Sequence, residues 1–308
     1  MSSSATASVQ VHKLTGNPSK AWKELSVEQK VEKVKPLPHD TPICADKLRV
    51  VCISDTHTRL ERYPERVPSG DILLHAGDFT KHGLPIEVKQ FNDFLGSMPH
   101  RVKVVIAGNH DLTFDDDLVK NRRDFLEHNF NINEDVFERK LAEFGVNTCK
   151  ELLTNCVYLE DASVSVCGLN IYGSPWQPQF PNWGFYLSRG EACLQKWNLI
   201  PDDTDILITH GPPIGHGDAS FFLRNRAGCV ELLSTIQQRV QPKYHVFGHI
   251  HRGYGITTDD VTTFINASTC TMLFRPNNPP IVFDIPLPTG HTKDELASVQ
   301  PCRLTRPL

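Results

Sequence analysis

Short runs of apolar residues recur along the chain and alternate with amphipathic segments. The runs are rich in β-branched residues and are bounded by polar residues or glycine, which is typical of buried strands. We expect such strands at residues 48–53, 72–74, 102–106, 206–208 and 244–247. Apolar residues three and four positions apart predict helices at 85–98, 136–144 and 230–240. This alternation indicates an α/β fold with largely parallel strand pairing.

Other segments predict a second sheet and two flanking regions. Residues 164–172 have a hairpin-like pattern, and short apolar stretches at 263–265 and 281–283 add to a partly antiparallel sheet. Residues 1–45 lack a sustained apolar period, so we expect a flexible or loosely docked N-terminal arm. Residues 46–287 are expected to form one domain, and residues 288–308 a polar C-terminal tail.

The composition describes a chain with a substantial core and little net charge. Of 308 residues, 39% are hydrophobic and 22% charged, which is enough to fill a core. A net charge of −4 lacks the basic surface with which proteins hold polymeric nucleic acid. Nine cysteines, an odd number, indicate a reducing compartment, and neither a secretory leader nor a membrane-spanning apolar run is found. We therefore expect a cytoplasmic protein that engages no membrane.

Histidine is frequent, with 14 residues, and several histidines follow the predicted strands together with carboxylates. Ligands bind outside the carboxyl ends of strands in an open α/β sheet, so these polar clusters are expected to converge on one rim. The candidate metal ligands are Asp55, His57, Asp78, Asn109, His210, His249 and His251. His75 and His245 lie within apolar runs and are expected to be buried, hydrogen-bonded histidines.

The types of these ligands indicate which metal they hold. Carboxylates, imidazoles and an amide carbonyl suit Mn²⁺, Fe²⁺ or Zn²⁺, whereas an all-oxygen set would suit Mg²⁺ or Ca²⁺. Seven donors are too many for one open catalytic metal. Two metals about 3.5–4 Å apart that share a carboxylate are the arrangement used for in-line attack at phosphorus. The sequence thus predicts two divalent metal ions, with Mn²⁺ preferred and Fe²⁺ or Zn²⁺ as alternatives.

The order of these clusters resembles the signature of the calcineurin-like metallophosphoesterase superfamily. The resemblance lies in Asp55-x-His57, Gly77-Asp78, Gly108-Asn109-His110-Asp111, His210 and Gly248-His249-x-His251. Residues 209–213, 245–248, 253–255 and 265–270 more narrowly resemble the metallophosphoesterase-domain-containing subgroup. The resemblance implies an α/β fold in which two mixed sheets form a β-sandwich flanked by helices.

The resemblance also implies a role for each site residue. Asp55, His57, Asp78 and His251 would hold the first metal, with Asp78 bridging to a second metal held by Asn109, His210 and His249. His110 would face the scissile phosphate and protonate the leaving oxygen, and Asp111 would orient its ring, since a general acid needs a free imidazole and a partner that fixes its tautomer. Because His249 is present, we expect a complete dinuclear site.

The function implied is hydrolysis of small phosphodiesters, such as cyclic nucleotides, by attack of a metal-bridging hydroxide, together with binding of AMP or GMP. Two alternatives stay open: a phosphomonoesterase or protein phosphatase, and a low-activity nucleotide-binding scaffold. Protein phosphatases of the superfamily carry an arginine shortly after the bridging aspartate and a glutamate after the acid histidine. This chain has Phe79-Thr80-Lys81 and Asp111 instead, which disfavours protein dephosphorylation. The oligomeric state is left open.

Substrate contacts are expected at the same loops and at one apolar segment. These contacts are Asn109, His110, Phe222, Leu223, His249, Ile250, His251 and Arg252. The aromatic segment 174–185 has two interpretations, a stacking wall for a nucleobase or a loop packed by its own rings.

Overall fold

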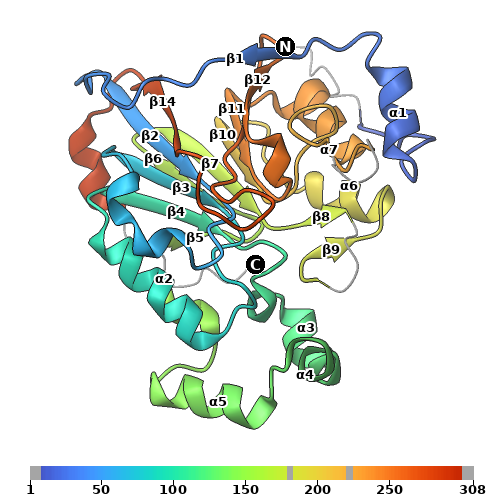
Figure 1. Ribbon diagram of the computed structural model, residues 1–308. Helices are drawn as coiled ribbons and strands as arrows, with labels where there is room; N and C mark the ends of the chain where they lie inside the picture. The colour runs from blue at the N-terminus through green and yellow to red at the C-terminus, as the bar shows by residue number, and fades with distance from the viewer. Residues whose placement is uncertain (1–7, 179–182, 220–224, 300–308) are drawn as a thin grey trace, which may run out of the picture.

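Two β-sheets pack face to face in the computed structural model, which describes residues 8–178, 183–219 and 225–299 (Figure 1). The first sheet has the order β14-β2-β3-β4-β5, and the second has the order β1-β12-β13-β11-β10-β7-β6. The first consists of β2 (Lys47–Ile53), β3 (Ile72–Ala76), β4 (Val102–Ile106), β5 (Val157–Tyr158) and β14 (Ile281–Pro286). The second consists of β1 (Glu32–Val34), β6 (Ala162–Val166), β7 (Leu169–Ser174), β10 (Ile206–Thr209), β11 (Tyr244–Phe247), β12 (Gly255–Thr258) and β13 (Thr263–Asn266).

Both sheets are mixed, as the sequence predicted. Strands β2 to β5 pair in parallel, and β14 adds to β2 in the antiparallel direction. In the second sheet β7, β10, β11 and β13 are parallel to one another. Strand β6 pairs with β7, β12 with β13, and β1 with β12, each in the antiparallel direction. The five predicted core strands are confirmed, but they divide between the sheets, three in the first and two in the second. The expected single rim is therefore the shared edge of a sandwich.

The alternation of side chains along β2 explains why the sheets form layers. Val50 and Cys52 point into the core between the sheets, whereas Val51 and Ile53 point outward to the helical side. All four are fully buried, because successive side chains on a strand face opposite sides and both sides are covered. The apolar runs that look continuous in the sequence are thus strands buried on both faces.

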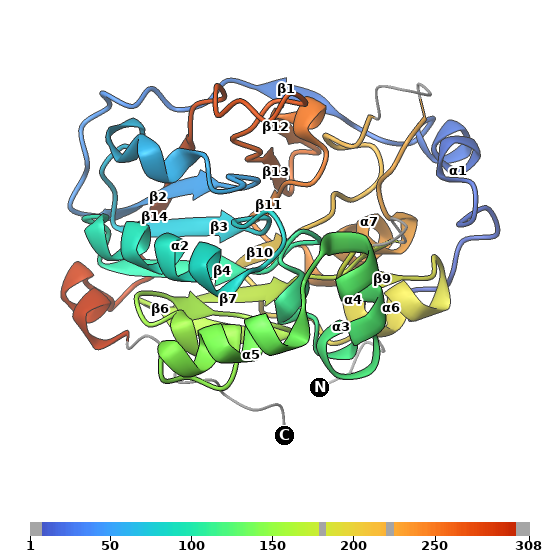
Figure 2. The ribbon, with the colours of Figure 1, turned by 60° about the horizontal axis from the view of Figure 1, so that its bottom comes forward.

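Helix α2 (Pro85–Ser97) covers the outer face of the first sheet, with α5 (Glu134–Glu143) beside it (Figure 2). Val88, Phe91 and Leu95 form its buried stripe, and the Glu87 carboxylate accepts a hydrogen bond from the Leu84 N–H at its start. Helices α6 (Glu191–Trp197) and α7 (Val230–Thr235) cover the second sheet. The predicted helix 230–240 changes at Ile236 into a π-helical turn that ends at Val240.

Two further helices precede α5 in the chain and lie to one side of it (Figure 2). Helix α3 (Asp116–Asn121) follows the loop after β4, and α4 (Arg123–Phe130) continues from it (Figure 2). A small two-stranded sheet, β8 (Gln177–Pro178) with β9 (Tyr186–Leu187), lies beyond β7. No helix within the described ranges is long and apolar enough to cross a membrane.

The N-terminal segment lies along the second sheet. Helix α1 (Pro18–Leu25) buries Ala21 against the cluster that contains Trp197, and β1 pairs with β12 and forms the edge of the sheet. Over residues 8–45 the structure thus has one helix and one strand with specific partners, and the flexibility expected for this arm stays a prediction. At the other end, the described part of the tail contains a 3₁₀ helix at Lys293–Ser298, with Leu296 in the core.

Candidate metal centre

Five loops at one edge of the sandwich carry the candidate ligands. Asp55 and His57 follow β2, Asp78 follows β3, and Asn109 follows β4. The second sheet contributes His210 after β10, and His249 and His251 after β11. The loops of the first sheet hold each other in place, since the Asp55 N–H donates to the Gly77 carbonyl at 2.9 Å and the His57 N–H to the Asp78 carbonyl at 3.0 Å.

Four of the candidate ligands adopt a backbone conformation that side chains usually avoid. Asp55, His57, Asp78 and His249 have φ angles of 51°, 45°, 57° and 65°. Left-handed backbone at a non-glycine residue costs roughly 1–3 kcal/mol and clusters at functional sites. Strain at four residues that point toward one another indicates that the surrounding loops are built to hold these side chains.

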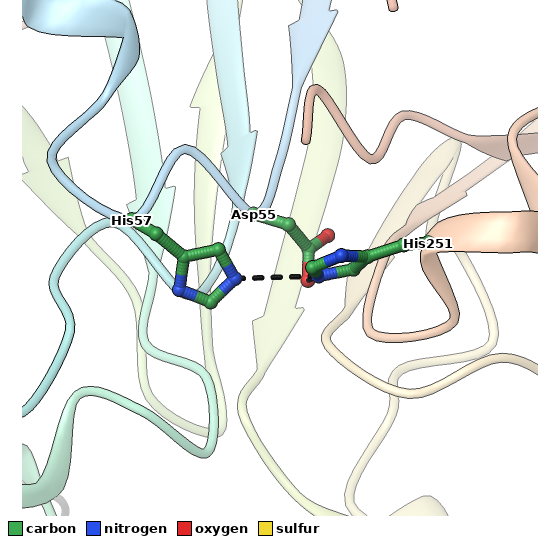
Figure 3. A group of neighbouring side chains, drawn as sticks. All are labelled: Asp55, His57 and His251. Carbon is green, nitrogen blue, oxygen red and sulfur yellow. Dashed lines mark hydrogen bonds and ion pairs between the residues drawn. The ribbon is translucent and has the colours of Figure 1, made fainter. Parts of the chain in front are cut away.

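Asp55, His57 and His251 form the first group (Figure 3). Their candidate ligand atoms all lie within 4.8 Å of one another. His57 Nε2 is 3.3 Å from His251 Nε2, and His251 Nε2 is 3.3 Å from Asp55 Oδ1. Asp55 is fully buried, and its other oxygen accepts a hydrogen bond from Ser268 Oγ at 2.9 Å.

Asp78 connects this group with a second one. Its Oδ2 is 3.9 Å from His57 Nε2 and 3.3 Å from His210 Nε2, so one carboxylate oxygen faces imidazoles from both groups. Beyond it, Asn109 Oδ1 is 3.0 Å from His210 Nε2 and 2.7 Å from His249 Nδ1. The structure therefore brings all seven predicted ligands together.

Backbone carbonyls fix the orientation of three of the rings. The Nδ1 atoms of His57, His210 and His251 lie 3.3, 2.9 and 3.0 Å from the carbonyl oxygens of Thr80, Ala76 and Thr271. A carbonyl only accepts, so each Nδ1 carries a proton, and Nε2 is the ring atom that faces the centre. His249 differs, because its Nδ1 faces the centre.

Burial and neighbouring charges shift the pKa values within the site. Burial lowers the pKa of His57 and of His249 to about 3, so both rings are neutral at pH 7. Burial also acts against the charged form of His210, but the Asp78 carboxylate outweighs it and raises the pKa of His210 to about 9. Burial opposes ionisation of Asp78 too, yet the charges of His210 and His110 hold its pKa well below the ordinary value. The site thus keeps the Asp78 carboxylate ionised.

These residues fit a dinuclear metal site. Two buried carboxylates face each other across basic nitrogens, an arrangement that needs positive charge to offset it. The lone pairs of His57 Nε2 and His251 Nε2 point toward a common region, which favours a cation between them. The donors are oxygen and imidazole nitrogen without a thiolate, as borderline divalent ions prefer.

His110 lies next to these groups, but its ring is held differently from our expectation. His110 Nδ1 donates to the Lys81 carbonyl at 2.9 Å, which leaves Nε2 as its second functional atom. The carboxylate of Asp111 points away from the ring and accepts hydrogen bonds from the N–H groups of Asp78, Thr80 and Gly108 at 2.8–2.9 Å. Asp111 therefore fixes the loops that carry Asp78 and Asn109 rather than orienting His110.

The remaining predicted substrate residues have different positions. Ile250 is partly buried and Arg252 is exposed, both beside His251. Phe222 and Leu223 lie outside the described residues. His75 and His245 are buried and bond Thr56 Oγ1 and Thr209 Oγ1 respectively, as expected.

Two aromatic residues near the site did not stand out individually in the sequence. Trp183 lies within the aromatic segment 174–185, and its ring centroid is 3.9 Å from that of His110. In the same segment Trp176 packs against Phe185 and donates to Asp161, so this part of the segment is packed by its own rings, and the stacking wall for a nucleobase stays a prediction. Phe274 contacts the ring of His57 edge-on and was missed, because it lies several residues beyond the predicted strand at 263–265 and outside the motif at 265–270. Its sequence signal is an apolar triplet, Met272 to Phe274, in a predicted loop.

The sandwich and its buried aspartate and histidine groups are those of a metal-dependent phosphoesterase. Residues 48–253 match the family model described as calcineurin-like phosphoesterase. The chain belongs to the calcineurin-like metallophosphoesterase family, as its motifs indicated.

The curated relatives narrow this family further. The chain is 50% identical over 286 residues to metallophosphoesterase domain-containing protein 1 of Homo sapiens, which covers 91% of this chain and 86% of that protein. It is 46% identical over 292 residues to a UPF0046 protein of Caenorhabditis elegans, covering 92% and 98% of the two chains. It is also 24% identical over 242 residues, 74% of each chain, to a protein of Nostoc described as a 3′,5′-cyclic-nucleotide phosphodiesterase.

Proposed function

We propose that the protein is a dinuclear metal-dependent phosphodiesterase that hydrolyses small phosphodiesters such as cyclic nucleotides and also binds AMP or GMP. The observation that carries this proposal is the position of Asp78, one oxygen of which faces imidazoles of both ligand groups, with His110 at the rim. The name of the Nostoc relative supports a cyclic nucleotide as substrate. Mn²⁺ is the metal we would load first, because it accepts this mixture of oxygen and nitrogen donors.

The ligands divide into two sets that Asp78 joins. Asp55, His57 and His251 would hold one cation, and Asn109, His210 and His249 the other. When bound, the two cations would neutralise charge on the phosphoryl oxygens and lower the pKa of the attacking water. The protein fixes these donors through the carbonyls behind the rings, so the donors need no rearrangement during the reaction.

His110 supplies the proton for the leaving group. Its Nδ1–H is tied to the Lys81 carbonyl, so Nε2 is the atom that gains and loses a proton. As the water oxygen bonds to phosphorus and the ester P–O bond breaks, the Nε2 proton of the imidazolium passes to the leaving oxygen. The His110 N–H also donates to Asp78 Oδ1 at 2.7 Å, which fixes the acid relative to the shared carboxylate.

A reducing, cytoplasmic location is part of the proposal. Eight cysteines of the described residues are free thiols, and seven of them are buried. We also propose that residues 46–287 form the catalytic domain, since all seven ligands and His110 fall within it.

The test is an assay of the full chain reloaded with Mn²⁺. We expect cleavage of bis-p-nitrophenyl phosphate and of 3′,5′- or 2′,3′-cyclic nucleotides, and slower cleavage of p-nitrophenyl phosphate. His110→Asn should lower kcat for cyclic nucleotides by roughly 10²–10⁴-fold while metal content stays at two ions per chain. Asp78→Ala should lose both metal and activity.

Each alternative gives a different result in the same assay. Faster cleavage of p-nitrophenyl phosphate than of any diester would indicate a phosphomonoesterase. Binding of AMP or GMP with no diester cleavage above the Asp78→Ala background would indicate a nucleotide-binding scaffold. Clearly fewer than two ions per chain after reloading would contradict the dinuclear mechanism.

A further inference from the structure

Two aromatic side chains, from distant parts of the chain, flank His110 at the mouth of the site. Phe274 comes from the loop after β13, and Trp183 from the segment before β9. Their ring centroids lie 6.3 Å and 3.9 Å from that of His110. The proposed catalytic acid, His110, therefore contacts two aromatic rings that come from two different loops.

Phe274 is held in an unfavourable position. It is 43% exposed to solvent and has a left-handed φ of 52°, although it is a large apolar residue. Its ring contacts His57 at 4.9 Å and His251 at 5.5 Å between centroids, both edge-on. An exposed apolar ring on strained backbone beside an active site indicates a surface that is covered when a ligand binds.

The loop of Phe274 is fixed to the candidate metal centre. The Phe274 N–H donates to the Thr271 carbonyl at 2.8 Å, and the same carbonyl faces His251 Nδ1 at 3.0 Å. The Thr271 N–H donates in turn to the Arg275 carbonyl at 2.8 Å. The turn that orients a metal ligand thus also presents the ring of Phe274.

Trp183 is equally well fixed. It packs against Phe130 of α4 at 5.1 Å between ring centroids and against His82 at 6.3 Å. The next residue, Gly184, donates its N–H to the carbonyl of the candidate ligand Asn109 at 3.0 Å. Trp183 and Phe274 are therefore preorganised, which lowers the entropic cost of binding a flat group against them.

The position of His110 determines what these two rings contact. A proton that leaves Nε2 goes to the oxygen of the departing ester group, so the organic part of that group must lie beside His110. The surfaces available there are the aromatic rings of Trp183 and Phe274. Aromatic faces bind other flat rings by stacking and tolerate any base.

We infer that Trp183 and Phe274 form a binding subsite for a flat aromatic group of the phosphoester, a nucleobase or an aryl ring. This inference rests on the proposed function and adds the residues that select the organic part of the substrate. It assigns the phosphate to the metal centre and the ring to the two aromatic side chains.

Direct binding to the Mn²⁺-loaded full chain, measured by calorimetry, tests the subsite without turnover. AMP is compared with ribose 5-phosphate, and phenyl phosphate with methyl phosphate, because each pair differs by one aromatic group. We expect AMP to bind about 5- to 100-fold more tightly than ribose 5-phosphate, from the usual contribution of stacking. Phe274→Leu and Trp183→Leu should each reduce this ratio at least about fivefold, with ribose 5-phosphate affinity and metal content unchanged.

Matched variants separate stacking from damage to the loop. Leu273→Ser changes a 75% exposed neighbour of Phe274 and should leave the ratio unchanged, while Trp183→Phe should restore most of it. Equal affinity of the wild type for AMP and ribose 5-phosphate would overturn the subsite. A fall in the affinity ratio of Leu273→Ser as large as that of Phe274→Leu would overturn it too. If neither ligand binds the wild type, the proposed function itself fails, a result distinct from failure of the subsite alone.

Discussion

Gly248 shows how closely the backbone approaches the candidate ligands. It lies in the loop after β11, where a Cβ atom would overlap the carboxylate of Asp55 and the hydroxyl of Ser54. Both groups are fully buried and have no room to move aside. A side chain at this position would displace a metal ligand directly.

We therefore expect Gly248→Ala to lower metal affinity by about 10- to 100-fold, the range seen when ligand support is lost. Titration of the metal-free protein with Mn²⁺ would measure this. Gly16→Ala is the matched control, because a Cβ there meets nothing within 4 Å. Unchanged metal affinity in Gly248→Ala would show that the loop after β11 adapts more readily than its contacts indicate.

The convergence of the seven candidate ligands was predictable because each lies shortly after an apolar run. A strand of known direction places the next few residues at a known edge of the sheet, so local sequence was sufficient. The role of Asp111 was not predictable in this way. Its hydrogen bonds go to Asp78 and Thr80, more than 30 residues earlier, and depend on how two loops meet. Phe274 was missed for a similar reason, since only the turn at Thr271 brings it back to the site.

At the level of elements, strands buried on both faces were predicted best. Their long apolar runs leave little choice of structure, and β11 matches its predicted bounds, 244–247. The N-terminal elements were harder. All three residues of β1 are exposed, and α1 spans only eight residues, so neither gives an apolar pattern that is sustained over a long segment. Backbone pairing with β12 orders β1, and no side-chain pattern reports that pairing.

The docking of α1 gives a prediction at this scale. Ala21 is fully buried against the cluster that contains Trp197, so Ala21→Glu would place a carboxylate in an apolar site. We expect the free energy of unfolding to fall by about 1–3 kcal/mol and α1 to become sensitive to protease. Lys20→Glu, one residue earlier and exposed, should change neither quantity. Equal protease resistance of the two variants would contradict the observed docking.

For the whole molecule, buried histidines predict a loss of stability in acid. His216 is buried against Phe264, and its Nδ1 forms a hydrogen bond with Thr257 Oγ1. Burial lowers the pKa of His216 to about 4. The Asp259 and Arg226 charges act on it in opposite directions. Between pH 6.5 and 4 the unfolded chain binds a proton that the folded chain does not, so stability falls as the pH falls.

His216→Phe keeps the ring and removes this titration. In the metal-free protein, we expect the loss of unfolding free energy between pH 7 and 4 to shrink by up to about 3 kcal/mol in the variant. Urea unfolding at several pH values measures it. His128→Gln, at an exposed position, should show the wild-type slope. The same dependence of unfolding free energy on pH in all three proteins would show that the pKa of His216 is not lowered in the folded protein.

Metal binding should also stabilise the whole fold, because the ligands come from both sheets. A ligand that binds only the folded state raises stability with its concentration. We expect chelation to lower the Tm of the wild type by roughly 5–15 °C, given a few kcal/mol of binding energy and about 2–4 °C per kcal/mol. Asp78→Ala should show no such shift. An identical Tm with and without chelator in the wild type would argue against metals that bridge the sheets.

The split of the site between two sheets has a consequence for biosynthesis. His57 and His251 are 194 positions apart in the sequence, yet their ring nitrogens are 3.3 Å apart. A nascent chain that has emerged only as far as β5 carries Asp55, His57, Asp78 and Asn109 without His210, His249 and His251. Metal capture is therefore a late event, possible only after β11 has joined the second sheet. Acquisition of metal reports that the whole sandwich has assembled, and a partly synthesised chain has no phosphoesterase site.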